Sequence, residues 1–527
     1  KMVKWEITAV QPTKRREQIE QIVVTAEQMR EIEGRIFEAG MPVAALMEKV
    51  AGLMARRIQT LYPYPQTRRV GVLVGPGHNG GDALVVAREL QCQGFEVLIY
   101  RPIQKLKELT SQHAQYAESL GIPFYEQIQP LLDCDLIIDG LFGFGQTRSL
   151  EGNLADMVKQ LNQLSQPILS IDLPSGIHTD TGEVLGTAIR ASRTFCLGLW
   201  KQAFLQDQGL DYLGEAELVD FGIPLADIWA VLGQSPGLMR VTSSMVRDCL
   251  PLKRPAATYK YKEGHLLLIC GSTQYSGGAI LTALGARASG VGMLSVAVPE
   301  SLKPLLVSHV PESLVIGCPE TNSGAIAQLP DSVNLSKFSA IACGPGLTLD
   351  GKSLVQGLMG VDCPLILDAD GLNSLAELKT IPTLIRRQGA TVLTPHVGEF
   401  KRLFPDSAEL LPNRVSAVQK ASQLSRSVIL LKGARSAIAN SQGSVWLVPD
   451  STPALARGGS GDVLTGLIGG LVAQPATAKF PLDATVAAAV WWHAQAGILA
   501  AQERTELGVD AFTLSEYLIP VFQDSRG

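Results

Sequence analysis

The residues with the clearest chemical potential form the stretch Gly458-Gly459-Ser460-Gly461-Asp462, which an apolar helical segment follows. Backbone N–H groups at the start of a helix can surround an anion, and the helix dipole adds to that attraction. In such a site Asp462 can accept the proton of a hydroxyl group whose oxygen attacks a phosphoryl group. The alternative is that Asp462 only caps the helix. Because glycine this dense destabilises a helix, we favour a ligand site.

Other polar segments of the same half directly follow predicted strands. They are residues 276–279, 344–346, 368–371, 394–399 and 432–436. Ligands of open α/β sheets collect at the carboxyl ends of the strands, so these segments are expected to face one site. The last of them offers Lys432 and backbone amides to nucleotide phosphates. A lone histidine is more often an ordinary polar residue, but at a strand end we expect His396 to face the ligand.

In the first half, a glycine-rich loop follows the strand predicted at 69–74. It reads Gly75-Pro76-Gly77-His78-Asn79-Gly80-Gly81-Asp82. Such a loop lets backbone amides approach an anion at the start of the next helix. A tight turn from a strand into a helix also needs glycine for steric reasons. The loop by itself therefore favours neither a ligand site nor a plain turn.

Two later strand ends shift the balance toward a site. The oxygen-bearing residues at the three ends are Asn79, Asp82, Asp139, Asp172 and Ser175. Ligands of this kind suit a hard cation, and Arg148 could meet a phosphate. One aspartate at a strand end is usually a helix or turn cap. Three at successive strand ends favour a binding site.

Alternating strands and helices must position these residues. Strands are predicted at 69–74, 96–100, 136–139, 167–172 and 194–199, with helical spacing over 81–91. In the second half they are predicted at 264–270, 293–298, 338–343, 364–368, 390–393 and 427–432, before a hairpin over 436–449. The alternation predicts an α/β fold with parallel sheets that helices cover on both faces.

The length of 527 residues is too great for one ordinary core. Composition changes after Phe221-Gly222-Ile223-Pro224, and residues 232–237 resemble a linker. We therefore expect a loose N-terminal arm over residues 1–24, a domain over 25–237 and a second domain over 238–527. The mixed-charge N-terminus has no hydrophobic segment typical of a signal peptide.

Charge and cysteine usage exclude several functional classes. A net charge of −5 gives no basic surface for nucleic acid or anionic membranes. The eight cysteines show no CxxC spacing, so neither a zinc knuckle nor a redox pair is indicated, and a reducing compartment fits them. The apolar stretch 484–501 contains Trp492, His493 and Gln495, which favours a buried helix over a membrane span. We expect a cytoplasmic protein.

The motifs GHNGGDA, DGLFGFGQTR and DLPSG of the first half resemble those of YjeF-type N-terminal domains, the NAD(P)H-hydrate epimerase family. The resemblance covers about residues 25–224 and implies a Rossmann-like three-layer α/β/α domain. It implies potassium ligands at Asn79, Asp139 and Ser175. The substrate residues that it implies are His78, Asn79, Gly80, Gly81, Asp82, Gly143, Phe144, Gly145, Gln146, Thr147, Arg148, Ser149 and Asp172.

In that family a lysine near the reaction centre matches Lys201, although a lysine at a strand end is more often solvated. Epimerisation at C6 of a nicotinamide hydrate requires ring opening or water loss, followed by re-addition. A carboxylate can move the proton for either route, and Asp172 is our candidate acid–base group. Two motifs depart from the family: His78 stands where NNGGDG has asparagine, with Ala83 in place of its last glycine, and Phe144 where FGTG has threonine.

The motifs GSGD, KGA, GPGL, DADGLN and TPHVGEF of the second half resemble those of the ribokinase-like superfamily, and most closely the ADP/ATP-dependent NAD(P)H-hydrate dehydratases. The resemblance covers about residues 241–519. It implies hydrate contacts at Ala279, Gly346, His396 and Asp462, with Asp462 catalytic. The nucleotide contacts that it implies are Lys432, Gly433, Ala434, Arg435, Ser436 and Gly461. Mg²⁺ would accompany the phosphates, and Thr348 departs from the family's GPGLG.

Together the two resemblances imply repair of hydrated nicotinamide cofactors. One half would interconvert the R and S forms of NADHX and NADPHX. The other would phosphorylate the ring hydroxyl of the S form with ADP or ATP and then eliminate phosphate. Two alternatives stay open: a vitamin or sugar kinase of the same superfamily, and a first half that only binds RNA or mediates oligomerisation. We also expect the chain to form a homo-oligomer.

Overall fold

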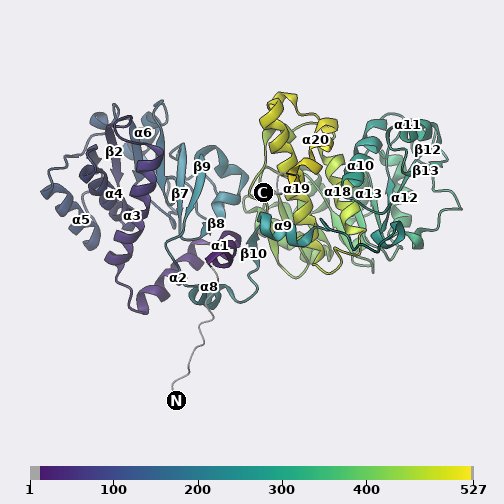
Figure 1. The fold of residues 1–527 in the computed structure, drawn as a ribbon, viewed down its shortest axis with the longest axis horizontal. Helices are drawn as coiled ribbons and strands as arrows, with labels where there is room; N and C mark the ends of the chain where they lie inside the picture. The colour runs from purple at the N-terminus through teal and green to yellow at the C-terminus, as the bar shows by residue number, and fades with distance from the viewer. Residues whose placement is uncertain (1–11, 524–527) are drawn as a thin grey trace, which may run out of the picture. The chain divides into compact units, whose positions relative to one another are not determined.

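The computed structural model describes residues 12–523, and contacts between residues divide the chain between Pro236 and Gly237 (Figure 1). The first unit contains a seven-stranded sheet in which every pairing is parallel. Its strands, in spatial order, are β4 (Phe124–Tyr125), β3 (Glu96–Tyr100), β2 (Arg69–Val74), β5 (Leu136–Gly140), β6 (Ile168–Ile171), β7 (Arg193–Leu197) and β9 (Glu215–Val219). The chain runs outward in one direction from β2 to β4 and then in the other direction from β5. In open α/β sheets, ligands bind at such a reversal.

Two separate apolar cores cover the two faces of this sheet. Along β2, Val70, Val72 and Val74 enter one core while Leu73 enters the other, because neighbouring side chains of a strand point to opposite faces. Helices α2 (Ala26–Glu38), α3 (Val43–Leu61), α4 (His78–Cys92), α5 (Glu108–Ser119) and α8 (Leu225–Leu232) contribute to the first core. Helix α6 (Gly152–Leu161) contributes to the second. The unit is therefore a three-layer α/β/α structure.

The prediction of a loose N-terminal arm over residues 1–24 is wrong for residues 12–24. Residues 12–21 form α1 (Pro12–Gln21), and β1 (Val23–Val24) pairs in parallel with β8 (Trp200–Lys201). Ile19, Ile22 and Val24 are almost completely buried in the first core. These apolar side chains stabilise the segment, so residues 12–24 are part of the fold. The expectation for residues 1–11 lies outside the described residues.

The strand predicted at 194–199 ends earlier than expected. Strand β7 stops at Leu197, because Gly198 has φ +78°, a conformation that favours glycine, and turns the chain. Lys201 follows on the separate strand β8 and is fully buried, unlike most lysines at strand ends. Strands β9 and β13 (Leu314–Cys318) were not predicted. Both lie at an edge of their sheet and are partly exposed.

The second unit contains a ten-stranded sheet. Its strands, in spatial order, are β10 (Leu238–Arg240), β19 (Val445–Leu447), β18 (Ala437–Ala439), β17 (Val428–Leu431), β16 (Thr391–Leu393), β15 (Leu365–Leu367), β14 (Ala340–Cys343), β11 (His265–Ile269), β12 (Met293–Pro299) and β13. Only the pairings of β18 are antiparallel. The predicted hairpin over 436–449 is thus formed by β18 and β19. Residues 238–240 pair with it as β10.

One large apolar cluster lies on one face of this sheet. It contains α9 (Ser243–Cys249), α10 (Ser276–Ala288), α11 (Lys303–His309), α18 (Ser460–Val472), α19 (Leu482–Arg504) and α20 (Ala511–Tyr517). Further helices lie outside this cluster: α12 (Lys352–Leu358), α13 (Asp370–Glu377), α14 (Thr380–Leu384), α15 (Val397–Leu403), α16 (Pro405–Ala408) and α17 (Arg414–Ser425). Residues 484–501 lie in α19, which is buried as expected. No helix among the described residues is long and apolar enough to cross a membrane.

Helices α10 and α18 pack against each other through glycine. A Cβ at Gly285 would lie 2.0 Å from the Val463 carbonyl oxygen, and one at Gly466 would lie 1.8 Å from the Thr282 carbonyl oxygen. Neither position has room for a side chain. Gly466, four residues after Asp462, therefore serves close contact between two helices.

The two units should unfold independently when expressed as residues 1–236 and 237–527. A first fragment that begins at Thr25 should lose stability on the order of 5 kcal/mol, because it lacks the buried Ile19, Ile22 and Val24. Thermal unfolding followed by circular dichroism measures the unfolding of each unit and the stability lost by the shortened first fragment. Equal melting temperatures for the fragments beginning at residues 1 and 25 would contradict the packing of α1 and β1.

Candidate active sites

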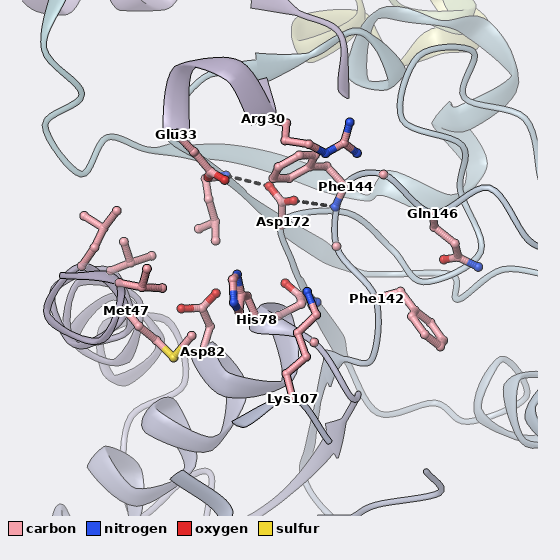
Figure 2. A pocket seen from close by; sticks show the side chains of 18 of the residues that line it. Arg30, Glu33, Met47, His78, Asp82, Lys107, Phe142, Phe144, Gln146 and Asp172 are labelled. Carbon is pink, nitrogen blue, oxygen red and sulfur yellow. Dashed lines mark hydrogen bonds between the residues drawn. The ribbon is translucent and has the colours of Figure 1, made fainter. Parts of the chain in front are cut away.

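The first candidate site is a pocket of about 880 Å³ at the carboxyl ends of β2, β5 and β6 (Figure 2). The predicted site residues that line it are His78, Asn79, Asp82, Gly143, Phe144, Gly145, Gln146, Asp172 and Lys201. Helices α2 and α3 complete the wall. The lining does not include Gly80, Gly81, Thr147, Arg148 and Ser149. Arg148 is exposed to solvent, and its contact with a substrate phosphate stays a prediction.

The glycines of the loop after β2 allow close approaches between backbone segments. A Cβ at Gly75 would lie 1.7 Å from the Leu141 carbonyl oxygen, and one at Gly80 would lie 1.9 Å from the Gly75 carbonyl oxygen. The loop thus leads directly into α4, whose N-cap residue is Gly77. The steric role of glycine is real here. It brings the helix start, with its free N–H groups, to the pocket wall.

Asp172 and Lys201 form a buried ion pair in the pocket wall. The Lys201 Nζ atom lies 2.6 Å from Asp172 Oδ1, and the Phe144 amide donates to Asp172 Oδ2 at 2.8 Å. The Leu197 amide donates to Oδ1 at 3.3 Å. Burial alone would lower the pKa of Lys201. The negative charges of Asp172 and Glu33 outweigh the effect of burial, and the pKa of Lys201 is raised. Asp172 also has φ +68°, a strained conformation for a residue with a side chain.

Asp139 lies just behind the pocket and is completely buried. The Ser175 hydroxyl donates to its Oδ1 at 2.7 Å, and the Ser175 amide and the Ser170 hydroxyl donate to its Oδ2 at 2.9 and 2.8 Å. Burial raises the pKa of Asp139, although these hydrogen bonds oppose the rise. The side-chain nitrogen of Asn79 is buried without a hydrogen-bond partner. The carboxyl of Asp139 and the hydroxyls of Ser170 and Ser175 thus place several oxygen atoms that could bind a cation close together.

The first pocket also contains acidic and basic residues that the motif analysis missed. They are Arg30 and Glu33 on α2 and Lys105 and Lys107 before α5. Figure 2 labels Arg30, Glu33 and Lys107. Burial raises the pKa of Glu33 to about 7, and burial together with Asp172 and Glu33 raises the pKa of Asp82. One signal could have found Glu33. It occupies the apolar face of α2, between the buried Ile32 and Ile36.

The second candidate site lies where the N-termini of α10 and α18 meet. A Cβ at Gly278 would lie 3.5 Å from Asp462 Oδ2 and 3.5 Å from the Gly346 amide nitrogen. Three predicted segments therefore converge here. The methyl group of Ala279 is buried against Gly271.

Asp462 does not cap its helix. The N-cap position of α18 is Gly459, with φ +90° and no side-chain capping bond, and Asp462 is the third residue of the helix. Within residues 12–523 no hydrogen bond to the Asp462 carboxyl is found. Burial raises its pKa to about 7; Asp368 adds to the rise and Lys432 opposes it. His493, whose pKa burial lowers to about 4, lies 2.9 Å from the Ser460 carbonyl oxygen through its Nε2 atom and holds the first turn of α18.

Lys432 and Asp368 form a second buried ion pair. Lys432 Nζ lies 2.8 Å from Asp368 Oδ1, and the Thr465 hydroxyl of α18 donates to Asp368 Oδ2 at 2.6 Å. Burial opposes ionisation of Asp368, but Lys432 and these hydrogen bonds outweigh burial and lower the pKa of Asp368. The Nζ atom of Lys432 also lies 3.5 Å from the position that a Cβ atom added to Gly461 would occupy. The lysine thus reaches the glycine turn while it stays paired with Asp368.

The remaining predicted residues fall in two places. Gly433, Ala434, Arg435 and Ser436 form the turn between β17 and β18, with Gly433 and Ala434 exposed. His396 is the N-cap of α15, where its Nδ1 atom accepts hydrogen bonds from the Gly398 and Glu399 amides. His396 therefore has a structural role as a helix cap, and 57% of its side chain is exposed. Within the described part of the chain, no group of three or more His, Cys, Asp or Glu residues could hold a metal ion.

Substitution of Gly80 by alanine should disrupt the loop after β2, since the new Cβ would overlap the Gly75 carbonyl oxygen. We expect a loss of several kcal/mol in the free energy of unfolding of the first unit, on the scale of other severely overpacked sites. Gly77→Ala is the matched control, because nothing lies within 4 Å of its Cβ position and its φ is −99°. Urea unfolding of the two variants measures the difference. Equal stability would refute the close approach.

Comparisons with known proteins agree with this division of sites. The family described as NAD(P)H-hydrate dehydratase matches residues 266–520, and the family described as YjeF-related protein N-terminus matches residues 43–203. A structure of ADP/ATP-dependent NAD(P)H-hydrate dehydratase from Bacillus subtilis, co-crystallised with ATP/Mg²⁺, is 34% identical and covers 54% of this chain and 97% of its own, with a TM-score of 0.46.

Two curated relatives cover nearly the whole chain, and both are named bifunctional NAD(P)H-hydrate repair enzyme. The protein from Synechocystis sp. is 57% identical over 96% of this chain and 95% of its own length. The protein from Thermosynechococcus vestitus is 51% identical over 95% of this chain and 97% of its own. These matches confirm the resemblance that the motifs of both halves indicated, and the chain belongs to the family of bifunctional NAD(P)H-hydrate repair enzymes.

Proposed function

We propose that this chain repairs hydrated NADH and NADPH in two steps. The first unit epimerises the R and S hydrates, and the second unit dehydrates the S form with ADP or ATP. The observation that carries the proposal is the site at Asp462. There a carboxyl without a partner among the described residues lies at the meeting point of two helix N-termini. That arrangement combines a base with donors for phosphoryl charge.

In the second unit, Asp462 takes the proton of the ring hydroxyl as its oxygen attacks the terminal phosphoryl group of the nucleotide. Free N–H groups at the starts of α10 and α18 stabilise the charge that develops on the phosphoryl oxygens. Phosphate then leaves with the electron pair of the C–O bond, and loss of a ring proton restores the reduced nicotinamide. Lys432 and the turn 433–436 bind the nucleotide phosphates.

Mg²⁺ would be bound mainly by the nucleotide. It keeps several waters and binds substrate phosphates with one or two carboxylates, which fits a site whose described residues offer no three-residue metal cluster. When bound, it neutralises phosphate charge. The chain's own part is to align the hydroxyl, the phosphoryl group and Asp462.

In the first unit, the pocket of about 880 Å³ receives the hydrated nicotinamide. The Asp172–Lys201 pair forms its polar wall, and Asp172 contacts the substrate. A potassium ion would be held by Asn79, Asp139 and Ser175, since the Ser175 hydroxyl already lies 2.7 Å from Asp139. The cation would supply a fixed positive charge beside the substrate. The proposal also includes a cytoplasmic homo-oligomer that does not bind nucleic acid, which light scattering and a salt-dependent RNA-binding assay would test.

The assay of the proposal uses the full chain with mixed hydrate epimers and ADP or ATP. The expected result is release of inorganic phosphate together with the absorbance of reduced nicotinamide, while chromatography shows both epimers consumed. A kinase of the same superfamily would instead leave phosphate on its product. Retained phosphate and no reduced nicotinamide would refute the dehydratase.

Asp462→Asn should lower dehydration turnover by a factor of about 10² to 10⁴, because the amide cannot take the hydroxyl proton. In the wild type the rate should rise with pH through about 7, where the Asp462 carboxyl becomes ionised. Nucleotide binding, measured by calorimetry, should stay close to normal. Exposed Asp331→Asn is the control. Near-normal turnover of Asp462→Asn would mean that the proton leaves by another route.

Asp139→Asn should abolish the dependence of epimer exchange on potassium and lower its rate, while dehydration of pure S hydrate continues. The measurement compares exchange in potassium and lithium buffers by chromatography. Asp133→Asn, on an exposed residue just before β5, is the matched control. If the wild type exchanges epimers equally well in both buffers, the potassium site is wrong.

A further inference from the structure

Glu33 and Asp82 are the two carboxylates of the first pocket that have no hydrogen bond or ion pair among the described residues. Glu33 lies on the buried face of α2 between Ile32 and Ile36, and Figure 2 shows its side chain at the pocket wall opposite Asp82. Within the described part of the chain, no hydrogen bond or ion pair to its carboxyl is found. A half-buried carboxylate without such a partner destabilises the folded state, and the fold gains nothing from it. This points to a role in function.

Asp172, the acid suggested by the motif, is already committed to other contacts. Its Oδ1 accepts from Lys201 and from the Leu197 amide, and its Oδ2 accepts from the Phe144 amide. These contacts hold the loop after β5 and the lysine in place. A group that takes and returns a proton needs an oxygen that faces the substrate without competing donors. Glu33 meets this condition better than Asp172.

The charged groups around Glu33 come from several elements. Burial raises its pKa to about 7, Lys201 on β8 and Arg30 on α2 oppose the rise, and Asp172 adds to it. Asp82 on α4 is also near enough to interact with Glu33, but burial, Asp172 and Glu33 raise the pKa of Asp82 well above its usual range, so Asp82 is the poorer base at neutral pH. The other titratable residues of the pocket lining are His78, Lys105 and Lys107. At neutral pH both protonation states of Glu33 are therefore populated, the optimum for a group that acts as base and then as acid.

We propose that Glu33 is the acid–base group of the epimerase half, with the Asp172–Lys201 pair positioning the loop and the substrate around it. This inference rests on the proposed epimerase function. It assigns the proton transfer to a helix that the glycine-rich and aspartate motifs do not include.

The reaction balances with one proton. The Glu33 carboxylate takes the proton of the C6 hydroxyl, the bond between C6 and the ring nitrogen breaks, and its electron pair stays on nitrogen. C6 becomes an aldehyde, and the protonated Glu33 gives its proton to the nitrogen. After rotation of the aldehyde, the reverse steps close the ring on the opposite face. Nothing is oxidised or reduced, and Glu33 ends as it began.

The test uses the full chain carrying Glu33→Gln. Epimer exchange should fall by about 10² to 10⁴, whereas dehydration of pure S hydrate by the second unit should be unchanged. Glu31→Gln is the matched control, since it lies on the exposed face of the same helix. Exchange within threefold of wild type in Glu33→Gln would overturn the inference. Failure of the proposed function looks different: then the wild type itself exchanges no epimers.

The pH profile separates a catalytic role from a structural one. The wild-type exchange rate should rise through about pH 7, as Glu33 ionises, and the remaining activity of Glu33→Gln should lack this rise. Any dependence due to His78 would persist in the variant. Glu33→Asp should recover part of the rate. If Glu33→Gln does not fold, a wild-type rate that is flat between pH 5.5 and 8.5 would still overturn the inference.

Discussion

Each unit of this protein buries a lysine–aspartate pair at the carboxyl end of its sheet. Asp172 with Lys201 and Asp368 with Lys432 are both largely or wholly withdrawn from solvent. A buried charge is tolerated only when a partner and further hydrogen bonds compensate it. The pairs therefore require their surroundings to be built around them: backbone amides complete the first, and the Thr465 hydroxyl of α18 completes the second.

Beside each pair lies an acid whose carboxyl has no hydrogen bond among the described residues. Burial raises the pKa of Glu33 and that of Asp462 to about 7 in both cases, and in both cases the paired aspartate adds to the rise while the paired lysine opposes it. The same electrostatic arrangement thus recurs in two different folds. One acid is held in an ion pair with a lysine and contributes to the structure, and the other acid is able to exchange a proton near neutral pH.

Glycine serves two purposes that the sequence does not distinguish. Gly285 and Gly466 let two helices approach, and Gly75 and Gly80 let one loop fold back on itself. Both kinds of contact bring helix N-termini to the sites. Glycine that is required for packing therefore also creates the binding geometry, because free N–H groups lie only at the helix start. This explains why a motif rich in glycine is informative even where most of its glycines touch protein.

The sequence by itself determined the two α/β halves, most of the strands, the strand ends that carry Asp139 and Asp172, and the glycine-rich helix start that carries Asp462, because alternation and turns into helices are local patterns. It also indicated the family. It could not place Glu33, which comes from a helix far from every motif and reaches the pocket only through packing of α2 on the sheet. Nor could it show that Lys201 is buried, since that depends on β1 pairing with β8 across the chain. Long-range contacts decide burial, and burial sets the protonation of these groups.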